Sequence, residues 1–159
     1  MKTSQKIILR IGCVLLFCWI AIIVVNAMSE PATTLGVQDG KLAPCPDSPN
    51  CVSTQAEDDG HAIEPIQFTC ASDAALKYAK EALLSMPRVA LVEEGPNYLR
   101  ATATTLLMRY VDDMEIYCDS SSQVLHFRSA SRLGYSDMGA NRKRMEAFRL
   151  KFEEISKKE

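Results

Sequence analysis

The sequence lacks the features that define several broad protein classes. It contains no internal repeat, and after residue 27 it has no apolar run near the roughly 20 residues needed to cross a membrane. Of its 159 residues, 47% are hydrophobic and 24% are charged, which is a globular composition. This composition excludes a disordered, collagen-like or polytopic membrane protein. Residues 1–27 carry three basic and no acidic residues, so without them the formal net charge falls from −2 to −5. A domain this acidic is a poor partner for nucleic acid, so we predict no nucleic-acid binding.

Signatures of catalysis and of metal binding are also scarce. The only two histidines, His61 and His126, could serve Cys51 as a base, but no local motif supports such a pair. Zinc ligands usually occur as closely spaced pairs, whereas Cys45 and Cys51 are six positions apart and the remaining domain cysteines are isolated. We therefore predict no catalytic residue, no metal and no cofactor.

The N-terminus has the pattern of an export signal. Lys2, Lys6 and Arg10 precede the uncharged apolar run Ile11–Val25, and the run ends in a small residue, Ala27, that suits signal peptidase. The run is also close to the lower limit of about 17 residues for a membrane-spanning helix. Residues 1–27 are therefore either a signal peptide or an N-terminal membrane anchor. In both cases we expect the domain to cross the inner membrane and to be periplasmic or anchored there.

The remainder divides into a linker and one domain. Residues 28–41 are polar and aperiodic, which predicts a linker, and residues 42–159 suffice for a single domain. Cys45 and Cys51 flank a proline-rich turn, so we predict a disulfide between them in an oxidising compartment. Cys70 and Cys118 either pair or remain buried thiols.

Apolar periodicity predicts two helices around a set of strands. Apolar residues recur at helical spacing from Ser72 to Met86 and over Gly139–Lys157. The segments with strand character are Arg88–Glu93, Tyr98–Thr105, Met114–Cys118 and Gln123–Ser129. We expect an α+β fold in which a small antiparallel sheet of three to four strands carries two amphipathic helices on one face.

The densest polar segment runs from Arg128 to Arg144, from a strand end into a helix N-terminus. Backbone amides at such a terminus, together with arginine and serine donors, suit a phosphate, sulfate or carboxylate. The residues we expect to bind the anion are Arg128, Ser129, Ser131, Arg132, Asn141 and Arg142. The supporting polar cluster is Asp112, Asp113, Ser136 and Asp137.

A structural interpretation of the same residues competes with the anion site. In it, Ser136 and Asp137 cap the helix, while the arginines pair with Asp112, Asp113 and Glu115. Exposed arginines around a concavity would favour binding, and arginines buried in pairs would favour a scaffold.

Three functions remain open. The first is a non-enzymatic envelope domain that binds an anionic small molecule, a lipid headgroup or an envelope protein through residues 128–144. The second is a hydrolase-like enzyme that uses this cluster with Asp112 or Asp113. The third is a purely structural assembly factor.

Three segments resemble the signatures of a bacterial and plastid family known as domain of unknown function 1499 (DUF1499): Pro44–Ser53, Tyr110–Glu115 and Arg128–Arg144. The likeness spans about Leu42 to Phe152. It implies an exported or membrane-attached single domain and brings no assigned activity. The positions that match the motifs are Cys45, Asn50, Cys51, Asp112, Asp113, Arg128, Ser129, Ser131, Arg132, Gly134, Ser136, Asp137, Asn141 and Arg142.

Overall fold

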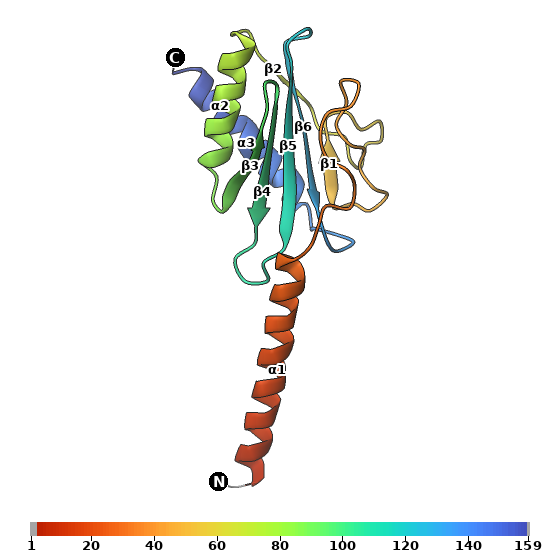
Figure 1. Cartoon of the computed structure of the whole chain (residues 1–159), viewed down its shortest axis with the longest axis vertical. Helices are drawn as coiled ribbons and strands as arrows, with labels where there is room; N and C mark the ends of the chain where they lie inside the picture. The colour runs from red at the N-terminus through yellow and green to blue at the C-terminus, as the bar shows by residue number, and fades with distance from the viewer. Residues whose placement is uncertain (1–2, 159) are drawn as a thin grey trace.

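The structure, a computed structural model, describes residues 3–158, so Met1, Lys2 and Glu159 lie outside the described residues. A long helix, α1 (Thr3–Ala27), projects from one end of a domain that holds all the other elements (Figure 1). The domain contains two further helices, α2 (Ser72–Leu84) and α3 (Ala140–Ser156). The segment Gln5–Ala27 of α1 is long and apolar enough to cross a membrane.

All paired strands form one antiparallel sheet. The sheet has the order β1-β6-β5-β4-β3, and the short β2 also pairs with β6. The strands are β1 (Cys51–Ser53), β2 (Ile66–Gln67), β3 (Val89–Glu94), β4 (Tyr98–Thr104), β5 (Val111–Asp119) and β6 (Val124–Ser131). On the side of β6 that faces away from β5, β1 pairs near the end of β6 and β2 pairs near its start.

The mixed class with an antiparallel sheet is confirmed, but the predicted number of three to four strands is wrong because there are six. The four longest strands coincide with the four segments that sequence alternation indicates. The two missing strands have three and two residues, too few for a period of two to be visible. Their position is fixed by pairing with β6 rather than by local sequence.

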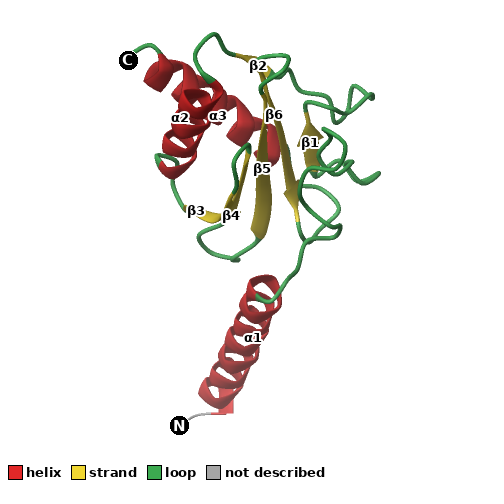
Figure 2. Ribbon diagram, turned by 45° about the horizontal axis from the view of Figure 1, so that its top comes forward, coloured by secondary structure: helices red, strands yellow, loops and turns green. Residues whose placement is uncertain are grey.

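The hydrophobic core lies between the sheet and the helices α2 and α3, which cover the same face (Figure 2). Alternation in β4 and β5 directs Leu99, Ala101 and Met114 into this core, where all three are fully buried. From α3, Phe148 packs edge-on against Phe127 of β6 with ring centroids 5.9 Å apart.

The chain that follows α1 covers part of the opposite face of the sheet. Gly36 N–H donates a hydrogen bond of 2.8 Å to Glu115, and Arg132 donates one of 2.5 Å to the carbonyl of Ser29. Arg128 donates to the carbonyl of Pro44. The segment expected to be a linker is therefore hydrogen-bonded to the domain near its start, at Ser29, and in its middle, at Gly36, and the chain is held again just after it, at Pro44.

We predict that Phe148→Ala lowers the free energy of unfolding by about 3–5 kcal/mol, because it leaves a cavity beside Phe127. Urea unfolding of the full chain in detergent, followed by circular dichroism, measures the loss. Leu150→Ala, on the exposed side of the same helix, is the control and should change stability by less than about 0.5 kcal/mol. Equal losses in both variants would contradict the assignment of the core.

Candidate functional site

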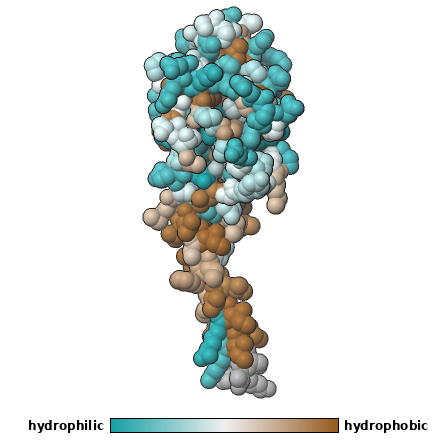
Figure 3. All heavy atoms as spheres, turned by 90° about the vertical axis from the view of Figure 1, so that its right-hand side faces the viewer, coloured by the Kyte–Doolittle hydropathy of each residue, from teal (hydrophilic) through white to brown (hydrophobic). Residues whose placement is uncertain are grey.

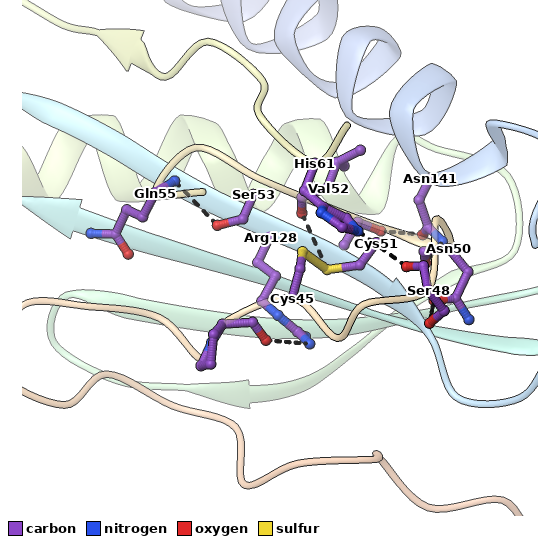
Figure 4. Close-up of a disulfide and its surroundings, with 12 residues drawn as sticks. Cys45, Ser48, Asn50, Cys51, Val52, Ser53, Gln55, His61, Arg128 and Asn141 are labelled. Atoms are coloured by element: carbon purple, nitrogen blue, oxygen red, sulfur yellow. Dashed lines mark hydrogen bonds between the residues drawn. A yellow bond between two sulfur atoms is a disulfide. The ribbon is translucent and has the colours of Figure 1, made fainter. Parts of the chain in front are cut away.

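The predicted disulfide between Cys45 and Cys51 is present, with the two Cα atoms 5.7 Å apart (Figure 4). It joins the segment after α1 to the first residue of β1, which pairs with Ala130 of β6. Cys70 and Cys118 are free thiols, and burial raises the pKa of Cys118. Of the two alternatives for these cysteines, the structure shows the unpaired one.

Asn50 immediately precedes Cys51 and is hydrogen-bonded to Asn141 at the start of α3. The Asn141 amide donates to the carbonyl of Asn50 at 2.9 Å and to Ser131 Oγ at 3.0 Å. Its oxygen accepts from Ser129 Oγ at 2.5 Å and from Arg144 at 2.6 Å. Since both atoms of the Asn141 amide are engaged and the side chain is buried, these bonds fix α3 to β6.

Three arginines each pair with one carboxylate of β5. Arg128 contacts Glu115 at 3.3 Å, with both side chains buried. Arg132 forms a two-pronged contact with Asp113, through Nε at 2.7 Å and Nη2 at 2.9 Å. Arg144, from α3, contacts Asp112 at 2.6 Å. We call these six residues the ion-pair frame.

The frame has members on both faces of the sheet. Asp112 points to the helices and meets Arg144, whereas Asp113 and Glu115 point to the other face and meet arginines from β6 and its end. Neighbouring Asp112 and Asp113 are thus held apart by the pleat. Within residues 3–158 there is no group of three or more histidine, cysteine or acidic residues that could hold a metal.

The six residues expected to bind an anion do not converge. Ser129, Ser131 and Asn141 meet on the helix side, and Arg128 and Arg132 lie on the other side because side chains of β6 alternate. The sixth residue, Arg142, donates to the carbonyls of Ala62 and Gly60 in the loop after β1.

The hollow that buried Arg128 and half-buried Arg132 line together is small, although Arg132 also borders an open hollow of about 280 Å³ with Thr102, Thr104 and Arg109. The hollow lined by Arg128, Arg132 and Asp113 has a volume of about 20 Å³. A single water molecule needs roughly 10–15 Å³ by this measure, so the hollow has room for about one water and none for a phosphate ester.

Of the two residues expected to cap α3, Asp137 reaches an amide of the helix, whereas Ser136 bonds within the loop that precedes it. Asp137 accepts from the backbone N–H of Asn141 at 2.7 Å and from that of Gly139 at 2.9 Å. Ser136 Oγ accepts from the N–H of Met138 at 3.3 Å. These amides, which an anion would otherwise use, already have acceptors.

Sequence reasoning missed several residues that hydrogen-bond to the site or to the loop beside it. Tyr98 donates its hydroxyl proton to Glu115 at 2.8 Å, and nothing in its strand pattern predicts this contact. Arg144 follows Asn141 by three positions, a spacing that places two side chains on one helical face. Asn26, at the end of α1, donates to the carbonyl of Met108.

The model of the family described as "protein of unknown function (DUF1499)" matches residues 41–152, which is most of the chain. The chain belongs to the DUF1499 family. Among curated proteins, none matches it. In this DUF1499 domain, the three signature segments meet in space: the disulfide loop, the acidic start of β5 and the segment from β6 into α3 together form the disulfide, the Asn141 network and the ion-pair frame.

The surroundings of the two histidines of the DUF1499 domain shift their pKa values in opposite directions. A hydrogen bond of 2.8 Å from His61 Nδ1 to Asp58 raises the pKa of His61, and its Nε2 lies 3.1 Å from the carbonyl of Ser48. Burial lowers the pKa of His126, whose Nδ1 lies 3.2 Å from Thr54 Oγ1. Both rings are engaged by neighbouring structural groups.

We predict that Arg132→Ala lowers the free energy of unfolding by about 3 kcal/mol, because it leaves Asp113 buried without its partner. The measurement is urea unfolding of the full chain in detergent. Lys143→Ala, at an exposed position of α3, is the matched control. Suppose instead that Arg132→Ala unfolded at the same urea concentration as wild type, and that added phosphate stabilised wild type but not the variant. Arg132 would then be a ligand-binding residue and not part of the ion-pair frame.

We predict that His61 titrates above 6.5 and His126 below 6.5, as read from ring proton shifts by NMR. The raised pKa of His61 contributes stability that is present below pH 6.5 and is lost as pH rises through the folded-state pKa. The lowered pKa of His126 makes stability fall as pH drops below 6.5, because the unfolded state then binds the proton more tightly. Shifts in the same direction would contradict the assignment, and His61→Asn identifies which signal is which.

Proposed function

We propose that this DUF1499 protein is a membrane-anchored, extracytoplasmic domain that acts by binding or assembly and not by catalysis. Support comes from α1, which is long and apolar enough to span a membrane, and from the disulfide Cys45–Cys51, which suits an oxidising compartment. The basic residues Lys6 and Arg10 precede the most apolar part of α1, the arrangement that keeps the N-terminus in the cytoplasm.

The observation that carries the proposal is the position of Asn26 in the domain. Although it belongs to the last turn of α1, its side chain is buried and donates to the carbonyl of Met108 in the loop between β4 and β5. Three residues later, the carbonyl of Ser29 accepts from Arg132. Cleavage after Ala27 would cut between these two contacts and remove one of them, so we infer that α1 is retained as an anchor.

The ion-pair frame supports a structural role for the signature motif. Arg128, Arg132 and Arg144 are directed at protein carboxylates, and Arg142 is directed at protein carbonyls. A hydrolase would need a nucleophile with an oriented base. The candidate Cys51 is instead consumed in the disulfide.

The test is the intact mass of the protein recovered from the membrane fraction and from the soluble fraction of the same cells. We expect a mass that includes all of α1, because the anchor is part of the fold. Val25→Ala completes the small-residue pattern that signal peptidase prefers, and as a control it shows that cleavage can be detected. A wild-type product that begins at Met28 would overturn the anchored arrangement.

A further inference from the structure

Two loops of the domain carry exposed apolar side chains at their tips. The first loop connects β4 to β5 and is closed by hydrogen bonds between Thr105 and Tyr110, of 2.9 Å and 2.8 Å. At its tip, Leu106 and Leu107 are each 69% exposed. Hairpin tips are normally built from glycine, asparagine or aspartate, so two adjacent exposed leucines on a preformed turn need an explanation.

The second loop connects β6 to α3. In it, Tyr135 is 76% exposed and Met138 is 91% exposed, and Leu133 is also exposed. This loop is held at its base, because Asn50 donates to the carbonyl of Gly134 and Asp137 caps α3. Its apolar side chains are therefore presented by a fixed backbone and not by an unstructured tail.

Both loops lie at the end of the domain from which α1 projects. Strand pairing places them there, because Thr104 pairs with Val111 and Asp112 pairs with Ser131. The first loop is bonded to the last turn of α1 through Asn26 and Met108. The apolar surface of α1 continues onto this end of the domain (Figure 3).

The length of α1 locates the membrane surface. The candidate span Gln5–Ala27 has 23 residues, or about 35 Å at 1.5 Å per residue, against a hydrocarbon core of about 30 Å, and its two charged residues, Lys6 and Arg10, lie toward the end away from the domain. When this segment spans the bilayer, Ala27 lies at the surface on the domain side. Because the tip of the first loop lies beside the end of α1, it comes to the same depth.

We propose that the β4–β5 and β6–α3 loops form a bilayer-docking rim that inserts Leu106, Leu107, Tyr135 and Met138 into the headgroup region of the leaflet facing the domain. Leucine and methionine match the acyl boundary, and tyrosine is enriched at membrane interfaces. Arg109, in the first loop, is exposed and forms no ion pair with any residue from 3 to 158, so it is free to contact lipid phosphate. The proposal rests on α1 being retained, as proposed above.

Docking would give the domain a fixed orientation. A single helix leaves a domain free to rotate and tilt, whereas the helix together with two loops provides three separate attachments. The tips of the β3–β4 and β5–β6 turns, at the other end of the sheet, would then face away from the bilayer (Figure 1).

Tryptophan quenching in vesicles tests the rim directly, because the chain has one tryptophan, Trp19, in α1. In a Trp19→Phe background, Leu107→Trp reports on the first loop and Tyr135→Trp on the second. Leu150→Trp is the matched control, since Leu150 is an exposed leucine of α3, at 65%, outside the rim. Each full-length variant is reconstituted in phosphatidylcholine vesicles that contain lipid brominated near the headgroup. The wild type is also reconstituted with lipid brominated in the middle of the acyl chain, because Trp19 lies eight residues, or about 12 Å, below Ala27, and its quenching is read with that lipid.

We expect Leu107→Trp and Tyr135→Trp to be quenched at least twofold more than Leu150→Trp, with emission shifted to shorter wavelength. Quenching equal to that of Leu150→Trp, while Trp19 of the wild type is still quenched, would overturn the rim and leave the anchor standing. An unquenched Trp19 would overturn the anchor and the rim together. A blue-shifted but unquenched Leu107→Trp would also overturn the rim, because a second protein copy would then cover the loop.

Discussion

The hydrogen bonds and the ion pair to the buried carboxylate of Glu115 hold the segment after α1 on the sheet, and the rest of the structure depends on them. Glu115 is fully buried on the face of the sheet opposite α2 and α3, where an unpaired charge would cost several kcal/mol. Three donors offset that cost: the hydroxyl of Tyr98 and the N–H of Gly36, each at 2.8 Å, and the guanidinium of Arg128 at 3.3 Å. Burial, reinforced by this carboxylate, raises the pKa of Tyr98, so the hydroxyl keeps the proton it donates.

These bonds connect strand pairing to the membrane anchor. Glu115 and Arg128 are direct partners in the β5–β6 ladder, so a slip by one residue would separate them. Asp113 and Arg132 extend the same face toward Ser29, which follows α1. The position of the anchor, and with it the depth of the two apolar loops, is therefore set by the register of two central strands.

Features that depend on residues close together in the sequence could be predicted, and features that depend on distant segments could not. The long strands and α3 follow from periodicity, and the disulfide follows from a short turn between two cysteines. The burial of Glu115 could not be predicted, because alternation shows only that it faces away from Met114 and Ile116 and not that residues 29–46 cover that face. The same alternation argument, applied along β6, would have separated Arg128 from Ser129 and divided the expected anion site.

Native-state hydrogen exchange of the Gly36 amide, in the full chain and in Glu115→Gln, tests the central claim most directly. If Glu115 holds the segment after α1 on the sheet, the Gly36 amide exchanges slowly in wild type and at least tenfold faster in the variant, whose neutral side chain is a weaker acceptor. Exchange of Gly36 in wild type at the rate of an unstructured peptide would contradict the claim. The sheet and the anchor would then be joined only by a flexible tether.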